Sequence, residues 1–278
     1  MEDMKKLKEI ELEIFRHFIE ICNENSLRYF VVGGTALGAV RHKGFIPWDD
    51  DIDVALPRGD YEKFLIAAQK SLPSNMFLQT YITDKNYPNP FAKLRQSDTA
   101  FIEKSTSKIK MNHGVYVDIF PLDGYSRSGI KGKLLGLKEK ILKISVGFVF
   151  VSGNISKNKF RAIVKRAIAR LLPDYRASVR RLDTMYKKIP YEDAEIIVNF
   201  CGAWAEKEIM PKAYFGDGIE GEFEGIKVVL PAKTHEYLTA LYGDYMTLPP
   251  EEERVGHHYY TVIDLEKSYK EYINNANA

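Results

Sequence analysis

Two short stretches decide how this chain folds: Tyr29-Phe30-Val31-Val32-Gly33-Gly34 and Asp49-Asp50-Asp51-Ile52-Asp53-Val54. The first is an apolar run that ends in a glycine pair, and the second is an acidic run that passes into an alternating pattern. Neighbouring carboxylates repel one another, so a fold keeps such a cluster together only when a cation lies among its members. A divalent metal beside a glycine turn is the simplest such arrangement, and it indicates phosphate chemistry.

Composition sets the bounds on what the chain can be. Its 278 residues suffice for one large domain or two smaller ones, and 45% hydrophobic with 28% charged residues is typical of a soluble globular protein. The net charge of +2 shows no global bias towards nucleic acid. Cys22 and Cys201 form neither a zinc motif nor a disulfide framework, which predicts reduced thiols in a cytoplasmic protein. The N-terminus predicts a charged amphipathic helix rather than a signal peptide.

Hydrophobic periodicity predicts alternating helices and strands, which places the chain in the α/β or α+β class with a mixed sheet flanked by helices. Helices are expected over residues 4–25, Thr35–Arg41, Tyr61–Ser71, Arg176–Lys187 and Thr234–Tyr242, the last ended by Gly243. Strands are expected over Tyr29–Val32, Asp51–Leu56, Val115–Phe120 and Ile226–Leu230, with an extended segment over 91–103.

The acidic strand is the predicted chemical centre. Strand alternation puts Asp51 and Asp53 on one face, near enough to share a metal. Mg²⁺ takes oxygen ligands and binds through one or two carboxylates plus substrate phosphates, with Mn²⁺ as the alternative ion. Asp118 is the candidate third carboxylate on a neighbouring strand, and Asp123 competes with it but is interpreted as a turn residue. The alternative interpretation of the whole run is an acidic surface turn.

The glycine pair suits a phosphate turn. Gly33 and Gly34 permit close backbone approach, and the helix expected after them offers unpaired N–H groups to an anion. Gly38 is followed by neither Lys nor Ser/Thr, so this is not a Walker motif, and Thr35 stands where a dinucleotide fingerprint needs its second glycine. Both of the commoner phosphate loops are therefore disfavoured.

Basic and aromatic residues complete the candidate site. Arginine offers a bidentate fork to a diphosphate, and an aromatic ring can stack on a base or sugar. Ordinary solvated charge, core packing and a surface histidine pair are the alternatives for these positions. The candidate substrate-binding side chains outside the glycine turn are Arg41, His42, Trp48, Asp50, Lys93, Arg95, His257 and His258.

The string from Gly33 through Pro47-Trp48 to Asp53 closely resembles the signature of the LicD family, which belongs to the nucleotidyltransferase-fold superfamily. The superfamily pattern is a glycine turn, an acid-apolar-acid strand and a third acid on a later strand, and Asp118 stands in that third place. Val117–Asp123 and Tyr242–Met246 also look like family motifs. The resemblance covers roughly residues 25 to 260.

The resemblance implies a reaction: transfer of phosphocholine, or another phospho-alcohol such as ribitol phosphate, from a CDP-activated donor to a sugar hydroxyl of teichoic acid or lipopolysaccharide. Asp51 and Asp53 would then hold Mg²⁺ on the donor diphosphate. Asp118 would hold a second metal and help to deprotonate the acceptor hydroxyl. Gly33, Gly34 and Thr35 would line the phosphate turn, and CMP would leave.

Residues 131–170 have a different composition from the rest of the chain. They contain eleven Lys/Arg and a single acid, Glu139, so this segment carries +10 and the other residues carry −8. The predicted division is a nucleotidyltransferase-like catalytic core over 1–125, a basic helical insertion over 126–190 and the remainder of the catalytic domain over 191–278. A cationic, partly apolar stretch can rest on anionic lipid, so peripheral contact with the inner face of the plasma membrane is expected here. A solvated insertion with an apolar core face is the alternative.

Two other functions fit the same residues. One is a nucleotidyltransferase of the same fold that moves NMP onto a protein, RNA or small molecule. The other is a non-catalytic metal-binding scaffold. The expected partners are the CDP-activated donor and a lipid-linked glycan, with neither nucleic acid nor an obligate protein partner.

Overall fold

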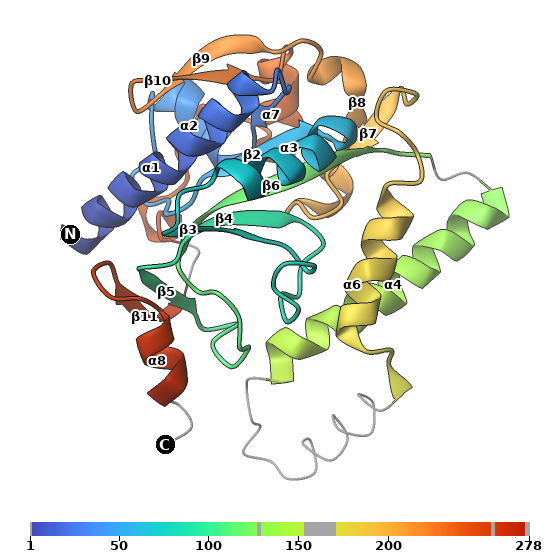
Figure 1. The fold of residues 1–278 in the computed structure, drawn as a ribbon. Coiled ribbons are helices and arrows are strands. Elements are labelled where there is room, and N and C mark those ends of the chain that lie inside the picture. The colour runs from blue at the N-terminus through green and yellow to red at the C-terminus, as the bar shows by residue number, and fades with distance from the viewer. Residues whose placement is uncertain (1, 127–128, 153–170, 257–258, 276–278) are drawn as a thin grey trace.

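A seven-stranded mixed sheet forms the centre of the computed structural model (Figure 1). The structure describes residues 2–126, 129–152, 171–256 and 259–275. β2 and β6 run parallel, and every other pairing within the sheet is antiparallel. The mixed sheet with flanking helices confirms the predicted fold class. The main path runs in the order β1 (Phe30–Val31), β2 (Asp53–Pro57), β6 (Val115–Gly124), β4 (Ala92–Gln96) and β3 (Met76–Gln79), and β7 (Ile196–Val198) and β8 (Ile209–Pro211) extend it beyond β6.

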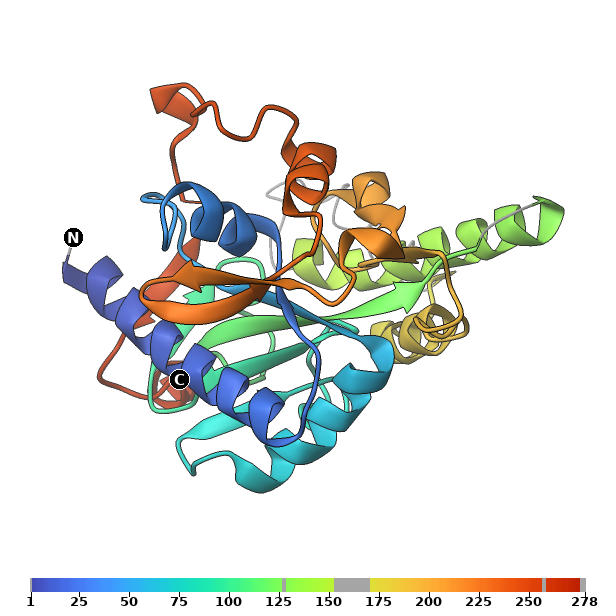
Figure 2. The same cartoon turned by 90° about the horizontal axis from the view of Figure 1, so that it is seen from above.

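Two helices, α1 (Glu2–Glu24) and α3 (Arg58–Ser71), cover one face of this sheet (Figures 1 and 2). The periodic apolar positions of α1, from Leu7 to Ile21, are buried in the main core. Both helices were predicted, and both begin a few residues earlier than expected. Burial of the apolar stripe fixes where each helix lies, whereas its first turn is set by local backbone geometry.

Three boundaries near the site differ from the sequence prediction. α2 (Gly33–Arg41) begins at the glycine pair, and β2 begins at Asp53 rather than at Asp51. β6 continues through Asp123, so the interpretation of Asp123 as a turn residue is wrong. Pairing with β7 keeps this end of the strand extended. Asp123 is fully buried there, and both of its oxygens accept hydrogen bonds from Arg58 at 2.7 Å.

The C-terminal part of the chain returns to the N-terminal part at two places. The hairpin of β9 (Ile219–Phe223) and β10 (Ile226–Leu230) packs beside β1 and α2, and β11 (Tyr260–Asp264) pairs with β5 (Ala100–Glu103). The main core accordingly draws its buried residues from both ends of the chain. The remaining elements are α7 (Thr234–Tyr242), α8 (Lys270–Asn275) and the short 3₁₀ turns Ala205–Glu208, Lys212–Tyr214 and Glu251–Glu253.

A helical pair leaves the sheet at the end of β6 and has its own small core. α4 (Gly129–Ser152) packs on α6 (Tyr175–Tyr186), and α4 projects beyond the body of the molecule (Figure 2). Leu142 and Val146 of α4 meet Val179, Leu182 and Tyr186 of α6. Residues 153–170 of the predicted basic segment lie outside the described residues. None of the described helices combines the length and the apolar character that crossing a bilayer requires.

Candidate active site

Three charged side chains lie in one row across the centre of the sheet. Asp53 of β2 is the register partner of Asp118 on β6, and Asp118 is in turn the partner of Lys93 on β4. Register partners point to the same face of a sheet, so the two carboxylates and the ammonium are neighbours. Lys93 Nζ lies 2.9 Å from Asp118 Oδ1 and 3.2 Å from Oδ2.

The row lies on the sheet face that points away from α1 and α3. Alternate residues of β6 share that face, and they pack against the loop before β4 and against β5, as the ring contacts of Phe120 with Phe91 and of Tyr116 with Phe101 show. Lys93 Nζ lies 3.3 Å from the centre of the Tyr116 ring, a cation–π contact that fixes the ammonium. Aromatic rings thus flank the Lys93 end of the row.

The carboxylates of the row perturb one another. Burial raises the pKa of Asp53 well above its usual range, repulsion from Asp51, Asp118 and Asp49 raises it further, and Lys93 opposes the shift. Burial also raises the pKa of Asp118, and Lys93 again opposes it. The folded site therefore disfavours the charged forms of these carboxylates, and an added cation would favour them.

The glycine turn lies directly against these acids. Thr35 Oγ1 accepts a hydrogen bond of 2.8 Å from the backbone N–H of Asp53. Gly33 has a φ of 55°, and a Cβ placed there would lie 3.1 Å from Asp53 Oδ2. A Cβ on Gly34 would lie 2.6 Å from Asp49 Oδ2. Only residues without side chains allow the turn and the carboxylates to approach this closely.

The first turn of α2 contains backbone N–H groups that have no hydrogen-bond acceptor among the described residues. Val32 precedes the helix and provides no side-chain cap. The N–H of Gly33 donates to the hydroxyl oxygen of Tyr237 at 2.9 Å, and the N–H of Ala36 donates to the carbonyl of Val32. Within the described residues, the amides of Gly34 and Thr35 make no hydrogen bond. The positive end of the helix and these two amides suit an anion such as phosphate.

The other acids of the run lie in the loop before β2. Asp51 is half-buried and close enough to raise the pKa of Asp53, and Asp50 is buried. Nowhere in the described residues do three His, Cys, Asp or Glu side chains form a group that could hold a metal ion. The register pair of Asp53 and Asp118 fits an ion held by two carboxylates and completed by substrate phosphates. The metal role of Asp51, Asp53 and Asp118 stays a prediction.

A second group of candidate residues gathers beside Trp48. The Arg254 guanidinium lies 5.7 Å from the Trp48 ring, and the His42 ring meets Trp48 edge-on at 6.4 Å. Arg41 donates from Nη1 to the carbonyl of Tyr245 at 2.7 Å. Burial lowers the pKa of Arg41 from its usual value. These contacts tie the C-terminal loop to the end of α2, and the predicted substrate contacts of this group remain untested.

Arg95 shares the face of Lys93 but is buried deeper. Its guanidinium donates to the side chain of Gln79 and to the carbonyl of Gly114, and it lies under the ring of Tyr116. These contacts give Arg95 a structural role, and its substrate contact stays a prediction. The predicted pair His257–His258 lies outside the described residues.

The structure adds site neighbours that the sequence analysis did not select. Tyr237 supports the Gly33 turn, and the hydroxyl of Tyr242 comes within 4.0 Å of a Cβ at that position. Tyr116 holds Lys93, and Glu208 lines a small cavity together with Tyr237. Tyr242 belongs to the Tyr242–Met246 motif, which was the one available signal. The others lie on elements whose proximity depends on the fold.

The family model described as LicD/FKTN/FKRP, nucleotidyltransferase domain, matches residues 26–151. The lipopolysaccharide cholinephosphotransferase LicD of Haemophilus influenzae is 33% identical over 257 residues, which cover 89% of this chain and 92% of that protein. The chain belongs to the LicD family. The family resemblance inferred from the glycine turn and the acidic strand is thereby confirmed.

More distant LicD relatives share a shorter region. The ribitol 5-phosphate transferase FKRP of Mus musculus is 26% identical over 124 residues, which cover 44% of this chain and 22% of that protein. Its Homo sapiens counterpart is 27% identical over the same length. All of these relatives are named as transferases of a phosphorylated alcohol.

Proposed function

We propose that this LicD protein is a metal-dependent phosphotransferase that moves a phospho-alcohol, most simply phosphocholine, from a CDP-activated donor to a sugar hydroxyl of a cell-surface glycan. Teichoic acid and lipopolysaccharide are the acceptor classes considered. The observation that carries the proposal is the row Asp53–Asp118–Lys93 beside the glycine turn. The names of the relatives support transfer of a phospho-alcohol to a glycan.

Two groups of residues in this chain would bind the diphosphate of the donor. The amides of Gly34 and Thr35 at the start of α2 would bind phosphate oxygens, and Asp53 and Asp118 would hold Mg²⁺ or Mn²⁺. When bound, such an ion neutralises pyrophosphate charge and stabilises the leaving group. Lys93 favours the ionised form of Asp118, and it would balance charge that develops on the transferred phosphoryl oxygens.

The chemistry balances without a covalent enzyme intermediate. The acceptor hydroxyl oxygen forms a bond to the phosphorus that carries the alcohol, and the bond from that phosphorus to the oxygen of CMP breaks. CMP leaves with the bonding electron pair. The hydroxyl proton passes to a carboxylate of the row, and Asp118 is the proposed acceptor.

The acceptor side of the proposal places the protein at a membrane. A lipid-linked glycan would bring the reaction to the inner face of the plasma membrane, and the basic segment 131–170 would make peripheral contact there. The cytoplasmic location and the CDP-activated donor are parts of this proposal.

A screen of donor binding tests the assignment directly. We expect CDP-choline, CDP-ribitol or CDP-glycerol with Mg²⁺ to raise the melting temperature more than CTP with Mg²⁺, because a ligand that binds the native state stabilises it by mass action. Incubation with labelled CTP and with labelled CDP-choline then distinguishes a phosphotransferase from a nucleotidyltransferase. A product that carries the nucleotide would instead identify a nucleotidyltransferase.

Substitution of the row tests whether it acts in catalysis. We expect Asp53→Asn and Asp118→Asn each to lower turnover by at least about a hundredfold, since each removes charge that would hold the ion. Asp98→Asn, on the exposed turn between β4 and β5, is the matched control and should leave turnover unchanged. Full activity in both row variants would favour the non-catalytic scaffold.

A further inference from the structure

The outward face of α4 carries a continuous apolar stripe. Its five members are between 43% and 78% exposed. They recur at alternating steps of four and three residues, which keeps them on one side of a helix over about 21 Å. No other described element shows a run of this kind. The stripe consists of Ile130, Leu134, Leu137, Ile141 and Ile144.

Lysines flank the stripe on both sides. At 100° per residue, Lys133 and Lys140 fall along one edge of the stripe and Lys138 along the other, and all three are exposed. The single acid of α4, Glu139, lies on the opposite face, where it is buried and accepts a hydrogen bond from the Tyr186 hydroxyl at 3.0 Å. The outward face of α4 is therefore apolar in its middle and purely cationic at its borders.

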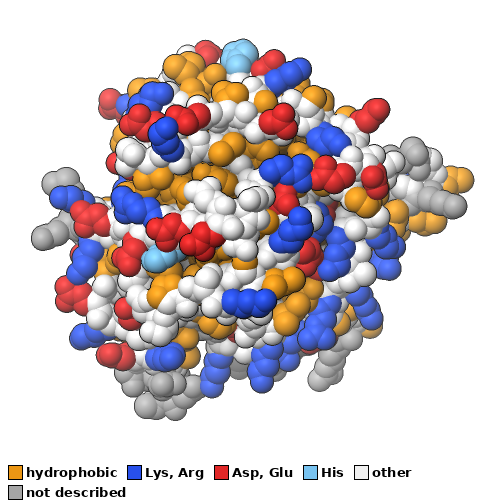
Figure 3. Space-filling model, turned by 45° about the horizontal axis from the view of Figure 1, so that its top comes forward, with side chains coloured by type: hydrophobic (Ala, Val, Ile, Leu, Met, Phe, Trp, Pro, Cys, Tyr) orange, Lys and Arg blue, Asp and Glu red, His pale blue; other side chains and the backbone are white. Residues whose placement is uncertain are grey.

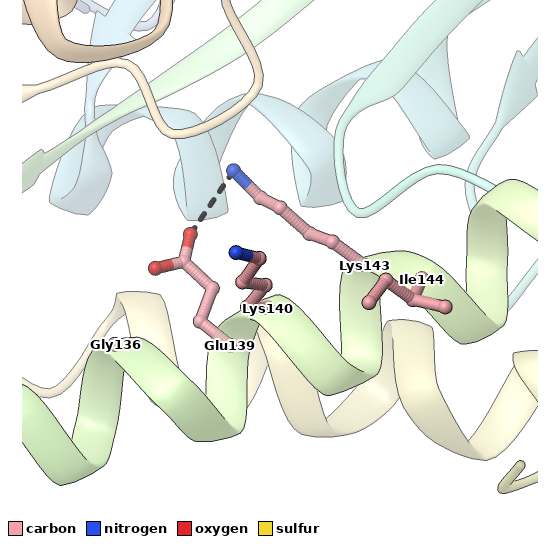
Figure 4. Close-up of a pocket in the computed structure, with 5 residues that line it drawn as sticks. All are labelled: Gly136, Glu139, Lys140, Lys143 and Ile144. Carbon is pink, nitrogen blue, oxygen red and sulfur yellow. Dashed lines mark ion pairs between the residues drawn. The ribbon is translucent and has the colours of Figure 1, made fainter.

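Neighbouring surface has the same sign of charge. α6 adds the exposed arginines Arg176, Arg180 and Arg181. Figure 3 shows Lys and Arg side chains gathered on the lower right of the molecule, the side that carries α4 and α6. Beside Ile144 of the stripe, α4 has a shallow hollow of about 380 Å³ that Glu139, Lys140 and Lys143 help to line, and Lys143 is ion-paired with Glu139 there at 3.0 Å (Figure 4).

The inner face of α4 is already occupied. Leu142 and Val146 pack on α6, and Ser145 Oγ donates to the carbonyl of Pro173 at 2.6 Å. Only one side of the helix is thus available, so the helix can lie in an interface but cannot be surrounded by lipid. A second copy of this chain is disfavoured as the occupant, because an isologous pair would set lysine-bordered stripes against each other.

We propose that α4 is an interfacial helix that docks this protein on an anionic phospholipid bilayer. The stripe enters the boundary between headgroups and acyl chains, and Lys133, Lys138 and Lys140 contact the anionic headgroups. This inference deepens the proposed membrane contact by assigning it to one face of one helix. Its motive is the lipid-linked acceptor of the proposed function, but its geometry is independent of the catalytic row.

Vesicle flotation of the full chain tests the docking. We expect binding to vesicles of equal parts phosphatidylglycerol and phosphatidylcholine, and little binding to pure phosphatidylcholine. The double variant Leu134→Ser/Leu137→Ser should lose at least about tenfold in partitioning, because the transfer of apolar area is removed. The triple variant Lys133→Glu/Lys138→Glu/Lys140→Glu should lose at least as much. High salt should weaken wild-type binding, since the Debye length falls to about 3 Å at about 1 M.

Matched controls carry the same chemistry elsewhere. Ile66 on α3 is 59% exposed and Lys70 is exposed on the same helix, so Ile66→Ser/Lys70→Glu should bind vesicles like the wild type. Absence of wild-type binding at low salt, or binding that the α4 variants leave unchanged, would overturn the proposal. So would loss of a dimer in Leu134→Ser/Leu137→Ser, because the stripe would then be a protein interface. The donor-induced rise in melting temperature should survive in the α4 variants, which separates failure of docking from failure of the proposed transferase activity.

Discussion

Lys93 is the counter-charge of the row. It is buried, ion-paired with Asp118 and held over Tyr116, so its ammonium has exchanged water for these two partners. A buried ion pair adds little net stability by itself, but removal of one partner leaves an uncompensated charge. Lys93 therefore favours the ionised form of Asp118 against the burial that raises its pKa.

This reasoning predicts a non-additive pair of substitutions. We expect Lys93→Met to lower the free energy of unfolding by about 3 kcal/mol, because it leaves the Asp118 carboxylate buried and unpaired. Asp118→Asn added to Lys93→Met should recover much of that loss, since the amide carries no charge. Urea unfolding of the wild type, both single variants and the double variant measures the coupling. Strict additivity would show that the two side chains do not interact in the folded protein.

Glu208 predicts a pH dependence of stability. Burial raises its pKa to about 7, although a hydrogen bond from the Trp204 backbone opposes the shift. The folded state therefore favours the protonated carboxyl. The resulting stabilisation is fully present below the unfolded pKa of about 4.5, is lost as the pH rises to about 7, and amounts to about 3 kcal/mol.

Comparison with a neutral variant isolates this effect. The unfolding free energy of the wild type relative to Glu208→Gln should fall by about 3 kcal/mol between pH 4.5 and pH 8. Urea unfolding across that range is the measurement. Glu206→Gln, two residues away and exposed, is the control and should follow the wild type. A constant difference across the range would mean that Glu208 titrates normally.

At the scale of elements, local sequence patterns predicted which helices and strands form better than they predicted where these begin and end. The helix α1 and the elements β10 and α7 follow from apolar spacing and, for α7, from the glycine after its last turn. The start of β2 at Asp53 could not be predicted from the local sequence, because pairing of Asp53 with Asp118 decides where the strand begins. The extension of β6 through Asp123 likewise depends on β7, which is about seventy residues away in sequence.

The corrected position of Asp123 reveals what attaches the α4–α6 pair to the sheet. Arg58, at the start of α3, binds Asp123 through two hydrogen bonds and also binds Asp183 of α6 at 2.9 Å. All three side chains are buried. One guanidinium thus joins a strand and two helices, and its planar fork suits this task better than an ammonium would.

Loss of this guanidinium should loosen α6. We expect Arg58→Met to cost about 3 to 5 kcal/mol, because two buried carboxylates lose their partner. Hydrogen exchange should speed up in α6 before it does so in α1. Lys227→Met breaks an ion pair with Glu220 that is exposed on both sides, and it should cost less than about 1 kcal/mol. An equal cost for the two substitutions would contradict the joining role of Arg58.

At the scale of the whole molecule, the candidate site is assembled from distant parts of the chain. The sequence placed the glycine turn, Asp53 and Asp118 in one site because they belong to a compact motif and to strands with a recognisable pattern. It could not place Tyr237, Arg254 or Glu208 there, because nothing local shows that α7 and the C-terminal loop fold back over α2. Long-range packing, not propensity, makes these residues neighbours.

The same long-range packing connects the C-terminus to the row. β11 pairs only with β5 in the described sheet, and the Phe101 ring of β5 contacts both Tyr260 of β11 and Tyr116. Tyr116 in turn contacts the ammonium of Lys93.

A chain that ends at residue 258 should therefore lose about 3 kcal/mol of unfolding free energy through exposure of Phe101. It should also show a weaker donor-induced rise in melting temperature. Lys6→Ala breaks only the exposed ion pair of α1 with Glu266 and should change neither quantity measurably. A truncated chain that loses stability but keeps the full donor response would show that Tyr116 holds Lys93 without support from β5.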